Sequence, residues 1–427
     1  MRRSCGILGV PSNQVSKGEN AVMKPPLSNV TVLKQIVDLI PRNLVPKLAK
    51  KHGVDKRSRS FKPWSHVVSM VFGQLSHALS LNDICDTLRH HSGVLTTCRR
   101  ATPPSRNGLS HANRERNADM AEDLFWGTLE HLQKQEPMFG PERNYKGMPR
   151  RFKRVIHVAD STTIRLVANC MDWAKHRRRK AAAKCHMRLD LQTFLPRFAL
   201  VKAANTYDAT EAIELCAGIR SGEIVIFDKA YVHFEHLHML AERGVFWVTR
   251  AKSNMQFETV GQHTAATGRI LRDERIRLIV EKSAKDYPSE LRLVTALVQV
   301  NDKDVEMTFI TNNFDWAPSS ICDLYKARWA IEVFFKELKQ TLQLADFLGH
   351  NENAVRWQIW TALLTYVLLR FIAYGSQWKG GFARLFTVLR GVLWSRLDVN
   401  GLLKFCGTAP GRSRMCAAPQ QAYLPGF

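Results

Sequence analysis

The sequence has no closely spaced cysteine pair, comparatively few acidic residues and no long hydrophobic run. Its nine cysteines are scattered, without a Cys-x-x-Cys pair or histidines at an accompanying spacing, which argues against a zinc site or a disulfide framework and is typical of a reducing cytosol. The longest apolar stretch, Ile359 to Ile372, is interrupted by polar residues and is shorter than the roughly 20 residues that span a bilayer, so a buried helix is expected there. Residues 1–22 have too short an apolar stretch for a secretory signal, and we expect a disordered extension with Met1 or Met23 as the true start.

Positive charge is in large excess. The chain has 62 Lys and Arg against 38 Asp and Glu, a formal net charge of +24 and a pI near 9.9. A net +11 of this lies in residues 143–190, where 14 basic residues accompany 3 acidic ones. This balance favours a polyanionic partner, most simply nucleic acid, with an acidic membrane surface as the alternative. A length of 427 residues predicts two or three domains.

The stretch Ser320 to Leu344 is predicted to form one long helix with a polar stripe. Ser320 and Asp323 have the spacing of a capping box after Pro318, so the helix should begin near Ile321. At 100° per residue, four polar side chains fall within an arc of about 60°: Tyr325, Arg328, Glu332 and Lys339. The neighbouring stripe is apolar and should be buried: Leu324, Ile331, Phe335, Leu338 and Leu342. Without further context, an ordinary surface ion pair four residues apart explains the arginine and the glutamate equally well.

The spacing Tyr-x2-Arg-x3-Glu-x6-Lys of those four residues matches the signature of one family without a gap. On this motif, the chain resembles the DDE transposases of the insertion-sequence-four family. The resemblance covers residues 155–344, including ADSTTI at Asp160, IFDKAYV at Asp228 and the later segment VTRAKSN. More weakly, residues 31–93 resemble the small helical domain often found at the front of these transposases. The implied fold class is α/β, with an RNase H-like catalytic core and a β-rich insertion, preceded and followed by helices.

Residues 23–136 are predicted to form a helical DNA-binding domain. Apolar residues at helical spacing predict helices from Thr31 to Pro41, at 64–79 and at 81–90. The last has Ser80 as its cap, Asp83 at the third helical position and Gly93 just beyond its end. The basic run at 50–62 is either a solvated loop or a phosphate contact, and both interpretations stay open. A linker is expected at 99–107, followed by one helix at 110–135.

Residues 150–345 are predicted to form the catalytic core, and residues 346–427 C-terminal helices and a loose tail. A buried strand at 155–159 should end at Asp160, and an apolar strand at 224–227 should end at Asp228. The pattern predicts further strands and helices: a hairpin of 184–191 and 194–201, a strand at 245–249, a β insertion at about 252–304 with antiparallel strands at 275–280 and 291–300, a returning strand at 305–313, and helices at 208–219, 233–243 and 357–374.

Three carboxylates are the candidate catalytic residues: Asp160, Asp228 and Glu332. The resemblance implies that they hold two Mg²⁺ ions, for which Mn²⁺ could substitute. Carboxylate oxygens suit Mg²⁺, and two such ions can activate the attacking oxygen and stabilise the leaving oxygen in phosphoryl transfer. For either aspartate alone, a turn or cap after a strand is an equally good interpretation.

Basic and aromatic residues near these acids are candidates for contacts with DNA. Arg328 would bind a phosphate through its bidentate fork, Lys339 as a point charge, and Tyr325 through a hydrogen bond. Trp329 could stack on an unpaired base, although ordinary packing is expected. A basic run after the first aspartate is either a track for the DNA backbone or a basic loop: Lys175, Arg177, Arg178, Arg179, Lys180 and Lys184.

The resemblance implies a cut-and-paste transposase that acts on double-stranded DNA, at the inverted-repeat ends of a transposon and at a target. It suggests a homodimer on synapsed ends, a hairpin intermediate, and a location in the bacterial cytoplasm at the nucleoid. Two alternatives stay open: a DNA-binding regulator or decayed element without catalysis, and a stand-alone metal-dependent nuclease. The intact three carboxylates argue against decay, and a requirement for paired ends would exclude the stand-alone nuclease.

Overall fold

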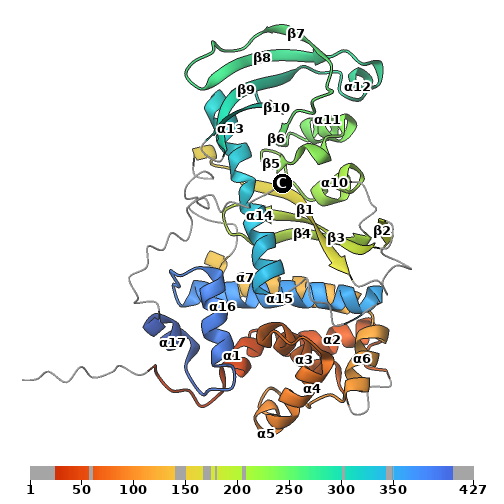
Figure 1. Cartoon of the computed structure of the whole chain (residues 1–427), viewed down its shortest axis with the longest axis vertical. Coiled ribbons are helices and arrows are strands. Elements are labelled where there is room, and N and C mark those ends of the chain that lie inside the picture. The colour runs from red at the N-terminus through yellow and green to blue at the C-terminus, as the bar shows by residue number, and fades with distance from the viewer. Residues whose placement is uncertain are drawn as a thin grey trace, which may run out of the picture.

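A computed structural model describes residues 25–56, 61–139, 151–166, 175–177, 180–203, 208–300, 303–342, 349 and 351–406. One half of the molecule holds a long sheet and the other half is helical, and the helices that follow the sheet cross from one half to the other (Figure 1). The predicted N-terminal extension, Arg178, Arg179 and the tail from residue 407 lie outside the described residues. Within the described ranges, no helix is long and apolar enough to cross a membrane.

The sheet has ten strands in the order β2-β3-β1-β5-β6-β10-β9-β8-β7, with β4 also paired to β3. The strands are β1 Ile156–Leu166, β2 Lys175–Arg177, β3 Lys180–Asp190, β4 Pro196–Ala203, β5 Ile224–Phe227, β6 Phe246–Arg250, β7 Phe257–Gln262, β8 Ile270–Leu278, β9 Leu291–Val300 and β10 Lys303–Thr311. The predicted strands and the hairpin are confirmed, but β7 is an additional strand and the hairpin loop is longer than the two expected residues.

The part β4-β3-β1-β5-β6 is an RNase H-like core. Strands β3 and β4 run antiparallel to their neighbours, whereas β5 is parallel to β1 and β6 is parallel to β5. Helices α10 Asp208–Cys216 and α11 Phe234–Glu242 follow β4 and β5 and pack on one face. The predicted fold class, α/β with an RNase H-like core, is therefore confirmed.

The β insertion continues the core sheet. Strand β10 pairs antiparallel with β6, and β9, β8 and β7 then extend the sheet outward, so the insertion shares backbone hydrogen bonds with the core (Figure 1). Inside it, Arg292 and Asp273 form a fully buried bidentate pair. The same guanidinium donates to the carbonyl of Trp316 at 2.6 Å, which fixes the loop that leads into the next helix.

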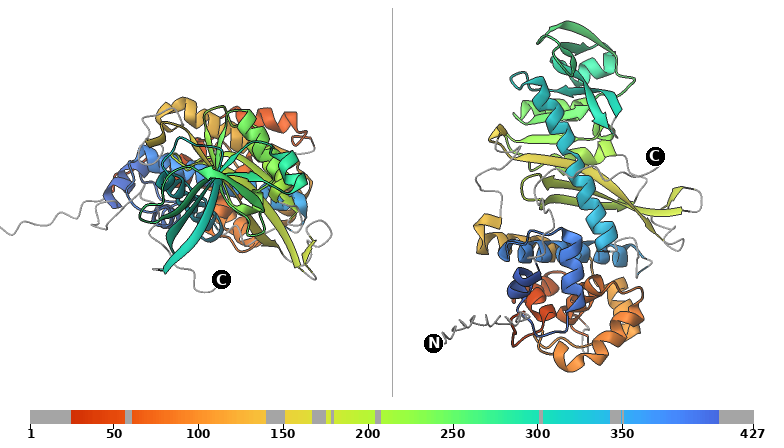
Figure 2. Two further views of the ribbon diagram at one scale, coloured as in Figure 1. Left: turned by 90° about the horizontal axis from the view of Figure 1, so that it is seen from above. Right: turned by 60° about the vertical axis from the view of Figure 1, so that its left-hand side comes forward.

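The helical half contains helices from both ends of the chain. From the first part come α1 Val32–Asp38, α2 Leu44–Lys51, α3 Pro63–Ser76, α4 Leu81–His90, α5 Ser92–Leu95, α6 Arg106–Glu115 and α7 Asp119–Gln135; from the last come α15 Glu352–Gly375, α16 Phe382–Gly391 and α17 Val399–Cys406. The central α15 is buried along most of its length, as predicted, and packs against α3, α6 and α7. Figure 2 shows the same helices clustered below the sheet.

Several N-terminal predictions need correction. The capping box of Ser80 and Asp83 is confirmed, and α4 ends at His90 with Gly93 beyond its end, as predicted, although Gly93 lies in a further short helix, α5. The basic run at 50–62 is partly helical, because α2 extends to Lys51, whose ammonium pairs with Asp123. The expected single helix at 110–135 is two helices, α6 and α7, and α6 begins within the predicted linker.

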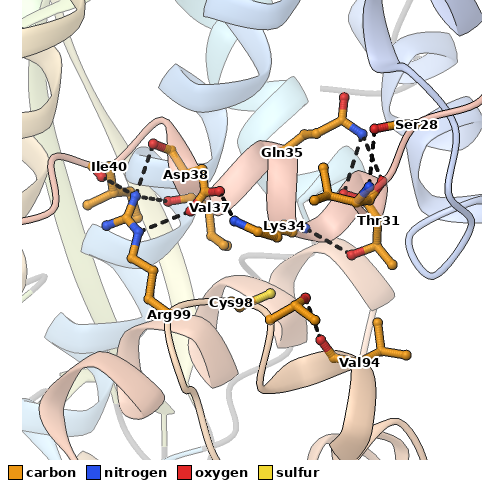
Figure 3. A network of polar contacts seen from close by, with 12 residues as sticks. Ser28, Thr31, Lys34, Gln35, Val37, Asp38, Ile40, Val94, Cys98 and Arg99 are labelled. Atoms are coloured by element: carbon orange, nitrogen blue, oxygen red, sulfur yellow. Dashed lines mark hydrogen bonds and ion pairs between the residues drawn. The ribbon is translucent and has the colours of Figure 1, made fainter.

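Arg99, placed in that linker by its sequence, is a packed structural residue. Its guanidinium donates to the side chain and carbonyl of Asp38 and to the carbonyl of Ile40, at the C-terminal end of α1 (Figure 3). It also stacks over the ring of Trp64 at 4.6 Å. The carbonyls of Asp38 and Ile40, at and just after the end of α1, are thus satisfied by one side chain 59 to 61 residues away, which the local composition did not indicate.

The predicted helix from Ser320 to Leu344 is interrupted. It consists of α13 Pro318–Ala327, α14 Trp329–Lys336 and the π-helical segment η4 Glu337–Thr341. The start at Ile321 is wrong, because Pro318 occupies the first helical position, where its missing N–H costs nothing. Asp323 therefore makes no capping box and pairs with Arg151. The apolar stripe is buried as predicted.

Candidate functional site

The register of the parallel strands brings two aspartates side by side. Ala159 of β1 pairs with Phe227 of β5. The next residues along the chain are Asp160, still within β1, and Asp228, directly after β5. Residues at matching positions of parallel strands point to the same face, which here is the face covered by α13 and α14. The prediction that the strand ends at Asp160 is wrong. Asp160 lies within β1, which continues to Leu166 by pairing with β3.

Arg328 connects the first aspartate to the glutamate on the helix. Its Nη1 donates to Oδ2 of Asp160 and its Nη2 donates to Oε1 of Glu332, both at 2.8 Å. The turn between α13 and α14 occurs at Arg328, where tight backbone hydrogen bonds run from Arg328 to Tyr325 and from Ile331 to Arg328. The guanidinium thus faces the sheet from the junction of the two helices.

Tyr325 connects the second aspartate to the same helix pair. Its hydroxyl donates to Oδ1 of Asp228 at 3.3 Å, and its ring packs on Phe309 of β10 and lies 5.6 Å from the Arg328 guanidinium. Asp228 itself caps the short helix η3 Lys229–Tyr231. The structure therefore brings together Asp160, Asp228, Glu332, Tyr325 and Arg328, as the sequence motif predicts.

Burial controls the electrostatics of this group. It raises the pKa of Asp160 to about 6, with the charges of Asp228 and Glu332 acting in the same direction and Arg328 opposing them. Burial would lower the pKa of Arg328, but the surrounding carboxylates outweigh it and raise that pKa further above its ordinary value. The site thus concentrates negative charge that needs a cation.

The residues present suit a divalent metal ion in type. Carboxylates that repel one another in a partly buried site are the hard oxygen ligands that Mg²⁺ or Mn²⁺ prefers. Among the described residues, however, no three His, Cys, Asp or Glu side chains are grouped closely enough to be ligands of one ion. Arg328 lies between Asp160 and Glu332, so these two carboxylates can share an ion only if the guanidinium moves.

Arg250 is a candidate that the motif analysis missed, although it lies within the quoted segment VTRAKSN. Thr249 of β6 pairs with Phe227, so Arg250 follows in the same register row as the two aspartates. Its positive charge acts on the pKa of Tyr325, which burial raises. Knowing the sheet order would have shown this proximity, but spacing in the sequence could not.

Lys339 and Trp329 occupy different surroundings. Lys339 lies in η4, and its charge acts on Cys185 of β3, two residues along the strand from the partner of Asp160. It therefore faces the same side of the sheet as the acids. Trp329 follows Arg328 directly and is 48% exposed, so its indole is partly packed and partly open to solvent.

The predicted basic track is separated from the acids. Lys175 and Arg177 in β2 and Lys180 in β3 belong to the end of the β1–β3 arm. This end is six to seven residues along β3 from Met187, the partner of Asp160, or roughly 20 Å. Lys184 alternates onto the opposite face of the sheet from Asp160. These residues are not part of the acid cluster.

Comparison with known proteins follows the same division of the chain. A family model for the transposase DDE domain matches residues 151–368, and one for a domain of unknown function, DUF4372, matches residues 28–97. The putative transposase y4zB of Sinorhizobium fredii is 33% identical over 274 residues, which is 63% of this chain and 75% of the relative. A probable transposase for insertion sequence element IS5377 of Geobacillus stearothermophilus is 27% identical over 52% of this chain and 58% of its own length.

Among solved structures, the piggyBac transposase synaptic complex with hairpin DNA matches with a TM-score of 0.44 and 10% identity, over 91% of this chain and 85% of that chain. The order and direction of the strands by themselves define the RNase H-like core of this chain. The matched family region contains both aspartates, the glutamate and the helix pair that carries it. The chain therefore belongs to the DDE transposase family, whose members act on DNA with the help of a divalent metal ion, and it carries an N-terminal DUF4372 domain.

Proposed function

We propose that this transposase cuts DNA at the ends of its transposon and joins the released ends to a target, with Asp160, Asp228 and Glu332 as its catalytic carboxylates. The observation that carries the proposal is the register of β1 and β5, which sets Asp160 beside Asp228 under the helix that bears Glu332. These three carboxylates would hold two Mg²⁺ ions, which supply the positive charge for the attacking and leaving oxygens.

The basic residues of the site would hold the DNA. Arg328 spans two carboxylates with its planar fork, a geometry that also fits a phosphate, and Arg250 sits at the far end of the same row. Tyr325 holds Asp228 in place through its hydroxyl and offers a hydrogen-bonding group beside it. Lys339 supplies a further charge on the same face.

The N-terminal helices would bind the transposon ends, and two copies of the chain would bring two ends together on the chromosome. A regulator without catalysis would have no use for three carboxylates that repel one another inside a partly buried site. A nuclease acting on single sites would not depend on paired ends. The regulator therefore differs from the proposal in that it does not cleave DNA, and the nuclease differs in that it does not require paired ends.

Charge-removing substitutions test the catalytic proposal. Asp160→Asn, Asp228→Asn and Glu332→Gln keep the side-chain shapes, so each full-length variant should still bind end DNA in a gel-shift assay. Each should lose Mg²⁺-dependent nicking and strand transfer, because a ligand charge is gone. Lys336→Ala, an exposed change on the helix that carries Glu332, is the control and should cleave normally. Cleavage that persists in all three variants would refute the proposal.

A further inference from the structure

Helix α6 presents a polar face that none of the contacts above uses. Five side chains on one side of this ten-residue helix are exposed, within an arc of about 140° at 100° per residue: Arg106, Asn107, Ser110, His111 and Arg114. The opposite side carries Leu109, Ala112 and Asn113 and is buried. All five side chains can form hydrogen bonds. The one exposed acid of α6, Glu115, lies at the border of this face and pairs with Arg114.

Within the described residues, four of these five side chains have no polar partner in the protein. Arg114 pairs with the neighbouring Glu115, but across the described part of the chain Arg106, Asn107, Ser110 and His111 make no side-chain hydrogen bond or ion pair. Asparagine and arginine are the side chains that form bidentate contacts with adenine and guanine edges, and serine and histidine are further donors and acceptors. The face has the chemistry of a surface that reads bases.

The helix is held rigidly from behind. Asn353 of α15 donates to the carbonyls of Asn113 and Arg116, and its side-chain oxygen accepts from Ala118 N–H at 2.9 Å. His66 of α3 bonds Asn113 at 2.7 Å inside the core. At the other end, the Ser105 hydroxyl accepts from the backbone of Gly108. A binding face on a helix fixed in this way loses little conformational freedom when it meets a ligand.

The neighbouring helix α4 is less suited to DNA. It packs directly against α6. Its exposed side includes Asp83, which caps the helix, and Asp86, which pairs with Arg89. Two carboxylates on the outer face would repel phosphates. The exposed side of α6 has two arginines, Arg106 and Arg114, against one acid, Glu115, so charge favours α6 over α4 as the DNA-contacting helix.

The position of α6 also suits a long ligand. It lies at the outer edge of the helical half, on the same flank as β2 and the end of the β1–β3 arm (Figures 1 and 2). From Arg106 to Arg114 the exposed face is about 12 Å long, which matches three to four base pairs at 3.4 Å each. A single helix fits the major groove, about 12 Å wide.

We propose that α6 is the helix that reads base edges in the major groove of the transposon ends, through Arg106, Asn107, Ser110 and His111. This rests on the proposed function, and it assigns sequence recognition to a segment between the two matched family regions. Arg114 and the basic residues elsewhere then contribute affinity for phosphates without selecting a sequence.

Selection from a pool of random duplexes tests this assignment with the full-length protein. Wild type should enrich a defined motif. Asn107→Ala and His111→Ala, made singly, should each reduce the preference within one block of three to four base pairs by about tenfold or more, while affinity for random duplex and its salt dependence stay nearly unchanged. Arg89→Ala on α4 is the matched control and should select the wild-type motif. Thermal melting should be unchanged in all three variants, since each position is exposed.

The possible failures are distinguishable. If Asn107→Ala and His111→Ala both select the wild-type motif, α6 does not read bases, and the transposase proposal is untouched. If only Arg89→Ala alters the motif, α4 is the reading helix. If wild type enriches no motif at all, the protein does not recognise a defined end sequence. That part of the proposed function and the base-reading role of α6 are then both refuted.

Discussion

Arg328 Nη1 lies 2.8 Å from Oδ2 of Asp160, and the two side chains are only 11% and 16% exposed. The residues are 168 positions apart in the sequence, one at the junction of two helices and the other in the middle of a strand. The second arm of the same guanidinium binds Glu332. One side chain thus neutralises two of the three proposed catalytic carboxylates.

Arg328→Ala should reduce cleavage of end DNA about 10- to 100-fold, because a hydrogen bond to a charged group contributes about 1.5 to 3 kcal/mol. Arg328→Lys should not restore the rate, since an ammonium lacks the planar fork that spans two partners. Single-turnover cleavage rates measure the effect, with Lys336→Ala as a control on the same helix. A wild-type rate in Arg328→Ala would show that the bridge is purely structural.

Arg250→Ala should weaken binding to end DNA regardless of sequence and lower the slope of log affinity against log salt by about one, as the loss of one phosphate contact does. The reason is its place in the register row of Asp160 and Asp228. Titrations at several salt concentrations measure the slope. Lys282→Ala, an exposed change in α12 Glu281–Asp286, should leave it unaltered. An unchanged slope in Arg250→Ala would place this side chain away from the DNA.

Trp329→Ala should lower folding stability by roughly 1 to 2 kcal/mol without unfolding the protein, because the 48% exposed indole buries only part of its surface. Stacking of an aromatic ring on a base contributes about 1 to 3 kcal/mol. The variant should therefore lose affinity for end duplexes with an unpaired base at the cut site by about tenfold or more, and lose little affinity for fully paired duplexes. Equal losses on both duplexes would rule out base stacking.

His66 should make stability depend on pH. Burial lowers its pKa to about 3, with Arg116 acting in the same direction and the bond to Asn113 opposing. Because the unfolded chain takes up this proton near pH 6.5 and the folded chain does not, stability should fall as pH drops from about 6.5 toward 3, by up to about 1.4 kcal/mol per pH unit. His66→Gln should show a shallower fall in denaturant titrations at each pH. Parallel curves for the two proteins would contradict this origin.

A fragment of residues 25–136 should not fold cooperatively. Gln35 of α1 donates to the carbonyl of Leu397 and accepts from Val399, and His66 stacks on Trp357 of α15 at 4.4 Å. Removing α15 to α17 would expose the core of the helical half. Thermal melts by circular dichroism should show a broad transition for the fragment. Adding residues 351–406 should sharpen it, whereas a sharp melt of the fragment alone would make the N-terminal helices an independent domain.

Local sequence patterns predicted many of the helices and strands and several residues of the candidate site. Residues a few positions apart share a face of a helix or strand. For this reason the sequence alone predicted the polar stripe of the Tyr-Arg-Glu-Lys motif, the apolar strand before Asp228 and the buried stripe beside Glu332. The same local rule predicted the Ser80 capping box, the hairpin of β3 and β4, and the buried helix α15.

Only the tertiary structure decided which distant residues meet. The parallel register of β1, β5 and β6 places Arg250 in the row of Asp160 and Asp228, and no spacing along the chain encodes that register. Likewise, Arg99 donates hydrogen bonds to carbonyls at the end of α1, and α15 packs against the N-terminal helices. Buried carbonyls need a donor and apolar faces need a packing partner, but either can come from any part of the chain, so the local sequence does not identify it. The break at Arg328 follows the same reasoning: the sequence predicts a continuous helix, and the junction lies where the guanidinium meets two carboxylates from different parts of the fold.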